Sequence, residues 1–304
     1  MKKDLTKMLD LTKDDILEIL NLADQMKYNL KHGRDHAVLK GQTLAMIFQK
    51  ASTRTRVSFE TGMYQLGGQA LFLSSNDLQI GRGEPVEDTA RVLSRYVDGI
   101  MIRTFAQEEV ETLAQWASIP VINGLTDFAH PCQVLADLMT VRERLSTLDN
   151  VHLTYIGDGN NMCNSLIIGG LTCGMTVSVA VPEGYDPASE ALAFAERYPG
   201  RFSLTRNPQE AARNADVLIT DVWASMGQEG EAQARREAFT GYQINGTLMD
   251  LAHPKAMVLH CLPAHRGEEI AADVFEAHAE EIFDEAENRL HAQKAVMALL
   301  MGQH

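Results

Sequence analysis

The feature that most constrains the fold is a series of short, almost continuously apolar runs that alternate with stretches of helical spacing. Four runs lie in the first half of the chain, at residues 42–50, 69–75, 97–104 and 119–125. Four more lie in the second half, at residues 151–158, 176–184, 216–223 and 256–263. Runs of this kind are typical of strands in a parallel sheet that helices cover on both faces. The chain is therefore predicted to have an α/β fold.

The pattern restarts near residue 150, and 304 residues are enough for two domains of ordinary size. We predict two domains, each with a central parallel sheet flanked by helices. The first is expected to span residues 1–145 and the second residues 146–285. The C-terminal segment, residues 286–304, has helical spacing and is expected to pack back on the first domain.

Charge and cysteine content exclude several classes of protein. The chain has 27 Lys plus Arg against 41 Asp plus Glu, a net charge of −14, which argues against a basic nucleic-acid-binding face. None of the four cysteines forms a C-x-x-C pair, the N-terminal residues lack the apolar core of a signal peptide, and no apolar run approaches the length of a membrane span. We expect a cytoplasmic protein with reduced thiols.

Residues that can do chemistry recur just after the apolar runs, where open α/β sheets bind their ligands. These residues are Ser52 to Thr55, Gln79, Arg103, His130 to Gln133, Asp158 to Asn161, Asp221 to Gly227 and His260 to Pro263.

The first of these segments, STRT at residues 52–55, follows a predicted strand and opens a predicted helix. Free backbone N–H groups and the helix dipole favour an anion there, and the guanidinium of Arg54 suits a phosphate group. The alternative is an N-capped helix whose arginines are solvated.

The segment HPCQ places Pro131 at the first position of a helix, between His130 and Gln133. A histidine and a primary amide can polarise a carbonyl group and recognise an amide. The alternative is a capping arrangement in which Gln133 returns to the backbone.

The segment YIGDGNN at residues 155–161 suggests a dinucleotide site, but the G-x-G-x-x-G pattern requires glycine at position 162, which is Met162. Two asparagines suit a small polar ligand better than a pyrophosphate.

Two further segments follow buried runs. In DVWASMG, Asp221 could pair with a substrate ammonium, or the segment could be an ordinary loop that ends at Gly227. In HCLPAHRG, His260, Cys261 and His265 suggest a metal by composition, but their spacing matches no common zinc pattern. Cys261 is better interpreted as a thiol that faces a pocket.

Taken together and in this order, STRT, HPCQ, DVWASMG and HCLP resemble the motifs of the aspartate/ornithine carbamoyltransferases, and the resemblance covers essentially the whole chain. HCLP replaces the HPLP of the aspartate-specific members, and the segment SSNDLQIGRGEPVEDT lacks their lysine. The chain is thus similar to the ornithine-specific branch of the family.

The resemblance implies transfer of the carbamoyl group from carbamoyl phosphate to the side-chain amine of L-ornithine, which gives L-citrulline and phosphate in arginine metabolism. The first domain would bind carbamoyl phosphate and the second ornithine. The resemblance also implies a homotrimer, or a multiple of trimers, with shared active sites, no metal or organic cofactor, and no nucleic-acid or membrane partner. The alternatives are a carbamoyltransferase for another amine, such as putrescine, and a non-catalytic binding protein on the same fold.

The family's motifs also imply site residues. The carbamoyl phosphate site would comprise Ser52, Thr53, Arg54, Thr55, Gln79, Arg103, His130, Gln133, Cys261, Leu262 and Arg289. The ornithine site would comprise Asn161, Asp221, Ser225 and Met226. The catalytic groups would be Arg54, Arg103, His130, Asp221 and Cys261, and Gln79 would lie on a loop that reaches a neighbouring subunit.

Overall fold

The computed structural model describes residues 3–75, 78, 83–224 and 229–302, and the chain forms two compact units. The first unit is Met1–Ala136 with Arg289–His304, and the second is Asp137–Asn288. The chain passes between them inside two helices, α5 (Pro131–Leu145) and α12 (Ala279–Met301). Each unit has its own parallel sheet, which confirms the predicted fold class.

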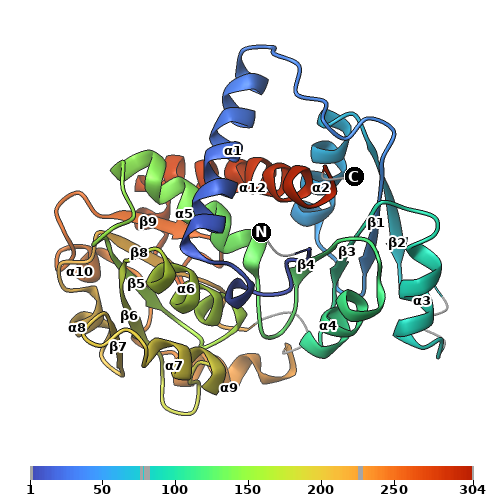
Figure 1. Ribbon diagram of the computed structural model, residues 1–304. Coiled ribbons are helices and arrows are strands. Elements are labelled where there is room, and N and C mark those ends of the chain that lie inside the picture. Colours follow the sequence, from blue (N-terminus) through green and yellow to red (C-terminus); the bar gives the residue numbers. More distant parts are fainter. Residues whose placement is uncertain (1–2, 76–77, 79–82, 225–228, 303–304) are drawn as a thin grey trace. The chain divides into compact units, whose positions relative to one another are not determined.

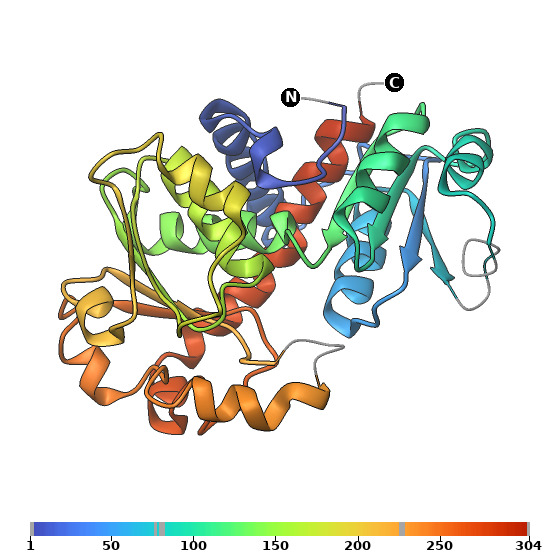
Figure 2. The ribbon, with the colours of Figure 1, turned by 90° about the horizontal axis from the view of Figure 1, so that it is seen from below.

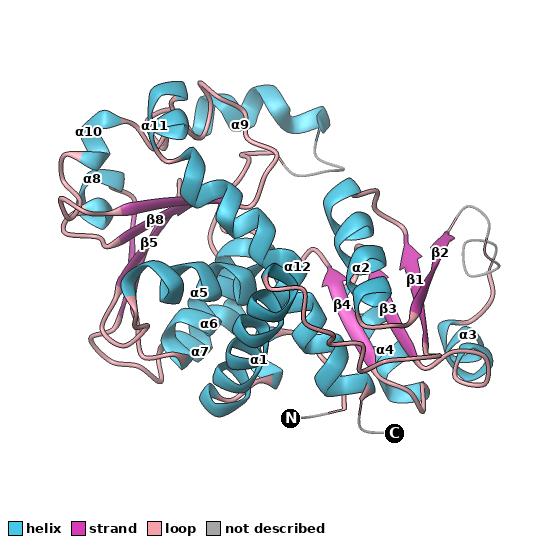
Figure 3. Ribbon diagram, turned by 90° about the horizontal axis from the view of Figure 1, so that it is seen from above, coloured by secondary structure: helices cyan, strands magenta, loops and turns pink. Residues whose placement is uncertain are grey.

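The sheet of the first unit has four parallel strands in the order β2-β1-β3-β4 (Figures 1 and 3). The strands are β1 (Thr43–Phe48), β2 (Gln69–Ser74), β3 (Gly99–Arg103) and β4 (Val121–Leu125). All four fall within the predicted apolar runs. Because Phe48 pairs in register with Arg103, the segments that follow β1 and β3 emerge side by side.

The helices of the first unit are α1 (Lys13–Lys31), α2 (Thr53–Gln65), α3 (Val86–Leu93) and α4 (Gln107–Trp116), after a short 3₁₀ turn at Met8–Asp10. Thr12 caps α1 by accepting a hydrogen bond from the N–H of Asp15. Along the sheet, the chain moves in one direction from β1 to β2 and in the opposite direction from β2 to β3 and β4. Right-handed crossovers therefore place α2 on one face of the sheet and α3 and α4 on the other (Figure 2).

The sheet of the second unit has five parallel strands in the order β7-β6-β5-β8-β9. The strands are β5 (His152–Ile156), β6 (Thr176–Ala180), β7 (Phe202–Thr205), β8 (Val217–Thr220) and β9 (Met257–His260). The strand order reverses between β5 and β8, which is where sheets of this type open a crevice at their carboxyl ends. Strand β7 was not predicted, since it is a short, half-exposed edge strand without a continuous apolar run.

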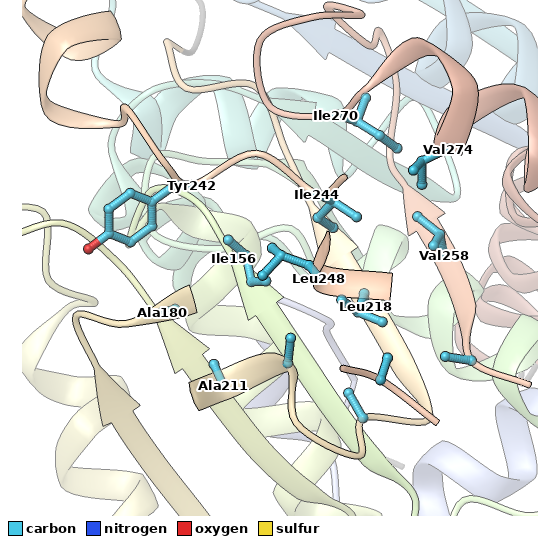
Figure 4. Close-up of a cluster of buried hydrophobic side chains, with 14 of the residues drawn as sticks. Ile156, Ala180, Ala211, Leu218, Tyr242, Ile244, Leu248, Val258, Ile270 and Val274 are labelled. Atoms are coloured by element: carbon cyan, nitrogen blue, oxygen red, sulfur yellow. The ribbon is translucent and has the colours of Figure 1, made fainter. Parts of the chain in front are cut away.

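The remaining helices belong to the second unit. They are α6 (Asn161–Thr172), α7 (Ser189–Ala195), α8 (Pro208–Ala212), α9 (Ala232–Ala238), α10 (Gly246–Met249) and α11 (Ala272–Ala277), with a 3₁₀ turn at Glu229–Glu231. Figure 4 shows the core on one face of the sheet, where Ile156, Leu218 and Val258 meet Leu248 and Val274. Within the described residues, every helix is too short or too polar to cross a bilayer.

Gly159 explains part of the GDGNN segment without a dinucleotide. A Cβ at this position would overlap the backbone of Tyr185, Asp186 and Pro187, and the Gly159 N–H donates to the Tyr185 carbonyl at 3.0 Å. The glycine therefore lets two loops of the second unit approach each other closely.

We predict that Gly159→Ala lowers the free energy of unfolding by about 1–3 kcal/mol, because backbone must shift to admit the methyl group. Urea unfolding of the variant measures this loss. Gly246→Ala is the matched control, since a Cβ there meets nothing within 4 Å. Equal stability of the two variants would contradict the packing argument.

Candidate functional site

The first cluster of candidate residues lies at the start of α2. Ser52 is the N-cap, and its hydroxyl accepts from the N–H of Thr55 at 3.2 Å. Arg54 lies exposed in the first turn. Arg56 pairs instead with Glu60 at 3.0 Å. The N-cap of the alternative interpretation is therefore present, and Arg54 is exposed beside it. An anion at the N-terminus of α2 would meet Arg54.

Thr55 is the centre of a buried polar network in the first unit. Its hydroxyl oxygen accepts from Arg289 Nη2 at 3.2 Å and from Arg103 Nη1 at 3.5 Å. Arg289 Nη1 also donates to Gln133 Oε1 at 2.6 Å. These acceptors are neutral oxygens, and the contacts orient the guanidinium groups.

Both arginines are about 95% buried, with exposed fractions of 5% for Arg103 and 4% for Arg289. Burying a cation is costly unless it is paired or coordinates an anion. Two guanidinium groups held around one hydroxyl have a geometry that suits an anion with several oxygen acceptors.

His130 is the N-terminal neighbour of α5 and lies buried in the same unit. Burial, and after it the positive charges of Arg289, Arg103 and Arg54, lower the pKa of His130 well below 6.5. The imidazole is therefore neutral at physiological pH and acts as a hydrogen-bonding group rather than as a fourth cation.

The second cluster lies in the second unit, where β8 and β9 end side by side. Thr220 pairs in register with His260, so the next residues, Asp221 and Cys261, are neighbours. The Cys261 thiol donates to Asp221 Oδ1 at 3.0 Å. Burial and the nearby Asp221 carboxylate raise the pKa of this thiol well above 9.0, so it remains protonated.

Asn160 completes this cluster, although the predicted ornithine site included only its neighbour Asn161. Its amide donates to Asp221 Oδ2 at 2.9 Å, and its carbonyl oxygen caps α6 by accepting from the N–H groups of Met162 and Cys163. The neighbouring Asn161 is buried at the first position of α6. The GNN segment signals an asparagine site, but only the fold determines which amide reaches Asp221.

The HCLPAHRG segment forms hydrogen bonds within the second unit. His260 Nε2 donates to Glu269 Oε1 at 2.9 Å, while its Nδ1 accepts from the N–H of Leu262. In the described part of the chain, one set of potential metal ligands has its ligand atoms within 4.8 Å of one another. This set is His265, Glu268 and Glu269. Cys261 is not part of that set.

The structure thus brings the predicted residues together in two sets. Ser52, Arg54, Thr55, Arg103, His130, Gln133 and Arg289 are in the first unit, with Thr53 exposed beside them. Asn161, Asp221, Cys261 and Leu262 are in the second. Gln79, Ser225 and Met226 lie outside the described residues.

Comparison with known proteins agrees with this geometry. Residues 3–143 match the carbamoyl-phosphate-binding domain of the aspartate/ornithine carbamoyltransferases, and residues 149–300 match the Asp/Orn-binding domain. The ornithine carbamoyltransferase of Thermococcus kodakarensis is 53% identical, with 99% of this chain and 96% of that protein aligned. That of Pelobacter propionicus is 55% identical, with 96% of each chain aligned.

Solved structures of ornithine carbamoyltransferases have the same fold as this chain. The ornithine carbamoyltransferase of Pyrococcus furiosus superimposes with a TM-score of 0.94 at 52% identity, covering 99% of this chain and 97% of that one. The anabolic enzyme of Campylobacter jejuni gives a TM-score of 0.93 at 42% identity, with both chains covered completely. On these grounds the chain belongs to the aspartate/ornithine carbamoyltransferase family.

Proposed function

We propose that this protein is an ornithine carbamoyltransferase, which transfers the carbamoyl group of carbamoyl phosphate to the side-chain amine of L-ornithine and releases L-citrulline and phosphate. The observation that carries the proposal is the pair of buried guanidinium groups around Thr55, beside Gln133 and the start of α2. Relatives that share the whole chain carry this name, one of them described as anabolic, which supports a role in arginine biosynthesis.

In the first unit the phosphate group would lie at the N-terminus of α2, where Ser52, Thr53 and Thr55 offer hydroxyl groups and Arg54 a guanidinium. Arg103 and Arg289 would bind the phosphate and the carbamoyl oxygen, on which negative charge develops during attack. Neutral His130 and the Gln133 amide would fix the carbamoyl group by hydrogen bonds. Gln79, Ser225 and Met226, which lie outside the described residues, would complete the substrate sites.

In the second unit Asp221 would pair with the α-ammonium of ornithine, and Asn161 would bind its carboxylate. The side-chain amine is protonated near neutral pH, so it must lose a proton before it attacks. The Cys261 thiol stays protonated and donates to Asp221, which supports the Asp221 carboxylate rather than Cys261 as proton acceptor. The new N–C bond then forms as the C–O bond to phosphate breaks, and phosphate leaves with the bonding electrons.

We predict citrulline formation from carbamoyl phosphate and ornithine, and none of the corresponding product from aspartate or putrescine. Arg54→Ala should raise the KM for carbamoyl phosphate by roughly 10²-fold, and Asp221→Asn should do the same for ornithine, since each removes a charge-assisted contact. Initial rates with each substrate varied in turn measure both effects.

Arg34→Ala, which removes an exposed arginine that stacks on Tyr28, is the control and should leave both KM values unchanged. Turnover of another amine in place of ornithine would refute the assignment of the second substrate. Normal carbamoyl phosphate kinetics in Arg54→Ala would refute the phosphate assignment.

We predict that His130 does not titrate between pH 8 and 6.5, because its pKa is lowered by burial and by three cations. A histidine whose pKa is lower in the folded state contributes stability that is present above pH 6.5 and is lost as pH falls below it. The loss attributable to His130 should approach about 1.4 kcal/mol per pH unit. Urea unfolding at several pH values, and the His130 ring signals in NMR spectra, test this prediction. A titration midpoint of the His130 ring near pH 6.5 would contradict the prediction. So would a His130→Gln variant whose free energy of unfolding depends on pH as steeply as that of the wild type.

We further propose a cytoplasmic homotrimer, or a multiple of trimers. All four cysteines are free thiols, which suits a reducing compartment. Helix α2 and the adjacent edge strand β2 expose four large apolar side chains, Val57, Tyr64, Leu71 and Phe72. Leu71 and Phe72 point to opposite faces of the sheet edge, and Val57 and Tyr64 lie on the neighbouring helix. Exposed apolar side chains at a sheet edge are typical of a subunit interface, and we take these four as one candidate patch.

Light scattering should therefore give a mass of about three times 33.6 kDa, or a multiple of that value. Leu71→Asp should shift the population toward smaller species, because a charge in an apolar interface is desolvated without a partner. Val38→Asp, at an exposed apolar residue outside this patch, is the control. A monomeric wild-type protein with full activity would contradict the proposal.

A further inference from the structure

Gln293 is a buried polar residue that the proposed mechanism does not yet use. It lies one helical turn after Arg289 in α12, on the same face, and has an exposed fraction of 0%. Its amide is satisfied when the oxygen faces Arg289 and the nitrogen faces α2. We adopt that orientation.

In this orientation the Gln293 oxygen accepts two hydrogen bonds from the Arg289 guanidinium, from Nη2 at 3.1 Å and from Nε at 3.2 Å. The Gln293 nitrogen donates to Ser58 Oγ at 2.5 Å, and Ser58 Oγ donates to the Thr55 carbonyl at 3.2 Å. The Gln293 amide therefore links the Nε–Nη2 edge of the Arg289 guanidinium to helix α2.

The adjoining edge of the same guanidinium meets the candidate ligand residues, Gln133 through Nη1 and Thr55 through Nη2, the nitrogen that Gln293 also contacts. Gln293 thus fixes both the rotation of the guanidinium plane and its distance from Thr55. It does so with a neutral acceptor. A carboxylate in the same place would form a two-pronged ion pair with Arg289 and would compete with an anionic ligand for its charge.

We propose that Gln293 is a positioning residue for the carbamoyl phosphate site, which holds Arg289 in its binding orientation through an uncharged amide and so adds no negative charge beside the guanidinium. This inference rests on the proposed function. It assigns a role to a residue that would not touch the substrate.

The test compares Gln293→Glu and Gln293→Leu with the wild-type enzyme. Glu keeps the acceptor but adds a charge, and Leu removes the acceptor. Each variant should raise the KM for carbamoyl phosphate and the inhibition constant of inorganic phosphate at least tenfold, equivalent to about 1.4 kcal/mol of binding free energy. The KM for ornithine should change less than twofold.

Gln65→Glu is the matched control. Gln65 Oε1 accepts from Lys294 Nζ at 2.8 Å, so this change also places a carboxylate beside a buried cation of α12, next to Gln293 in the sequence. Burial lowers the pKa of Lys294 to about 8. A new charge at position 65 should leave the phosphate inhibition constant unchanged.

The outcomes separate two kinds of failure. If wild-type protein forms no citrulline and is not inhibited by phosphate, the proposed function is wrong. If wild-type protein is active and folded Gln293→Glu keeps wild-type phosphate inhibition, the positioning role is wrong. Should Gln293→Glu fail to fold, Gln293→Leu decides alone. If either Gln293 variant lowers kcat and leaves both KM values unchanged, Gln293 stabilises the core and does not position Arg289.

Discussion

The buried guanidinium of Arg289 is the constraint on which the first unit depends. Its hydrogen bond to Thr55 joins residues 234 positions apart, and its bond to Gln133 spans 156 positions. A cation with 4% exposure needs several acceptors in fixed places, so α2, the start of α5 and the middle of α12 must meet around it. The same contacts fix the orientation of the guanidinium group.

In the second unit, the register of parallel strands brings the candidate site residues together. Because Thr220 and His260 are paired on adjacent strands, Asp221 and Cys261 leave the sheet together, and their side chains come within hydrogen-bonding distance. Burial, and after it the Asp221 carboxylate, raises the pKa of the thiol and keeps it protonated. Residues 40 positions apart thus form one hydrogen-bonded pair through strand pairing.

The edges of the two sheets are protected in different ways. Leu5 pairs with β4, donating to the Val121 carbonyl at 2.9 Å and accepting from the Asn123 N–H at 2.8 Å. On β9, carboxylates of α12 take the place of a strand, since Glu281 and Glu285 accept from the N–H groups of Val258 and His260. Strand β2 instead exposes Leu71 and Phe72.

Much of this protein could be predicted from its sequence. Eight of the nine strands follow from apolar runs, and the capped helix starts at Thr12 and Ser52 follow from local side-chain chemistry, because strand burial and helix capping are short-range effects. The motif order likewise indicated the family. The tertiary structure alone decided that Asn160 reaches Asp221, that Gln133 meets Arg289, and that Gln293 contacts the same guanidinium. These contacts join distant segments, and nothing in the local pattern specifies which side chain faces which partner until the strands are in register and the helices are packed.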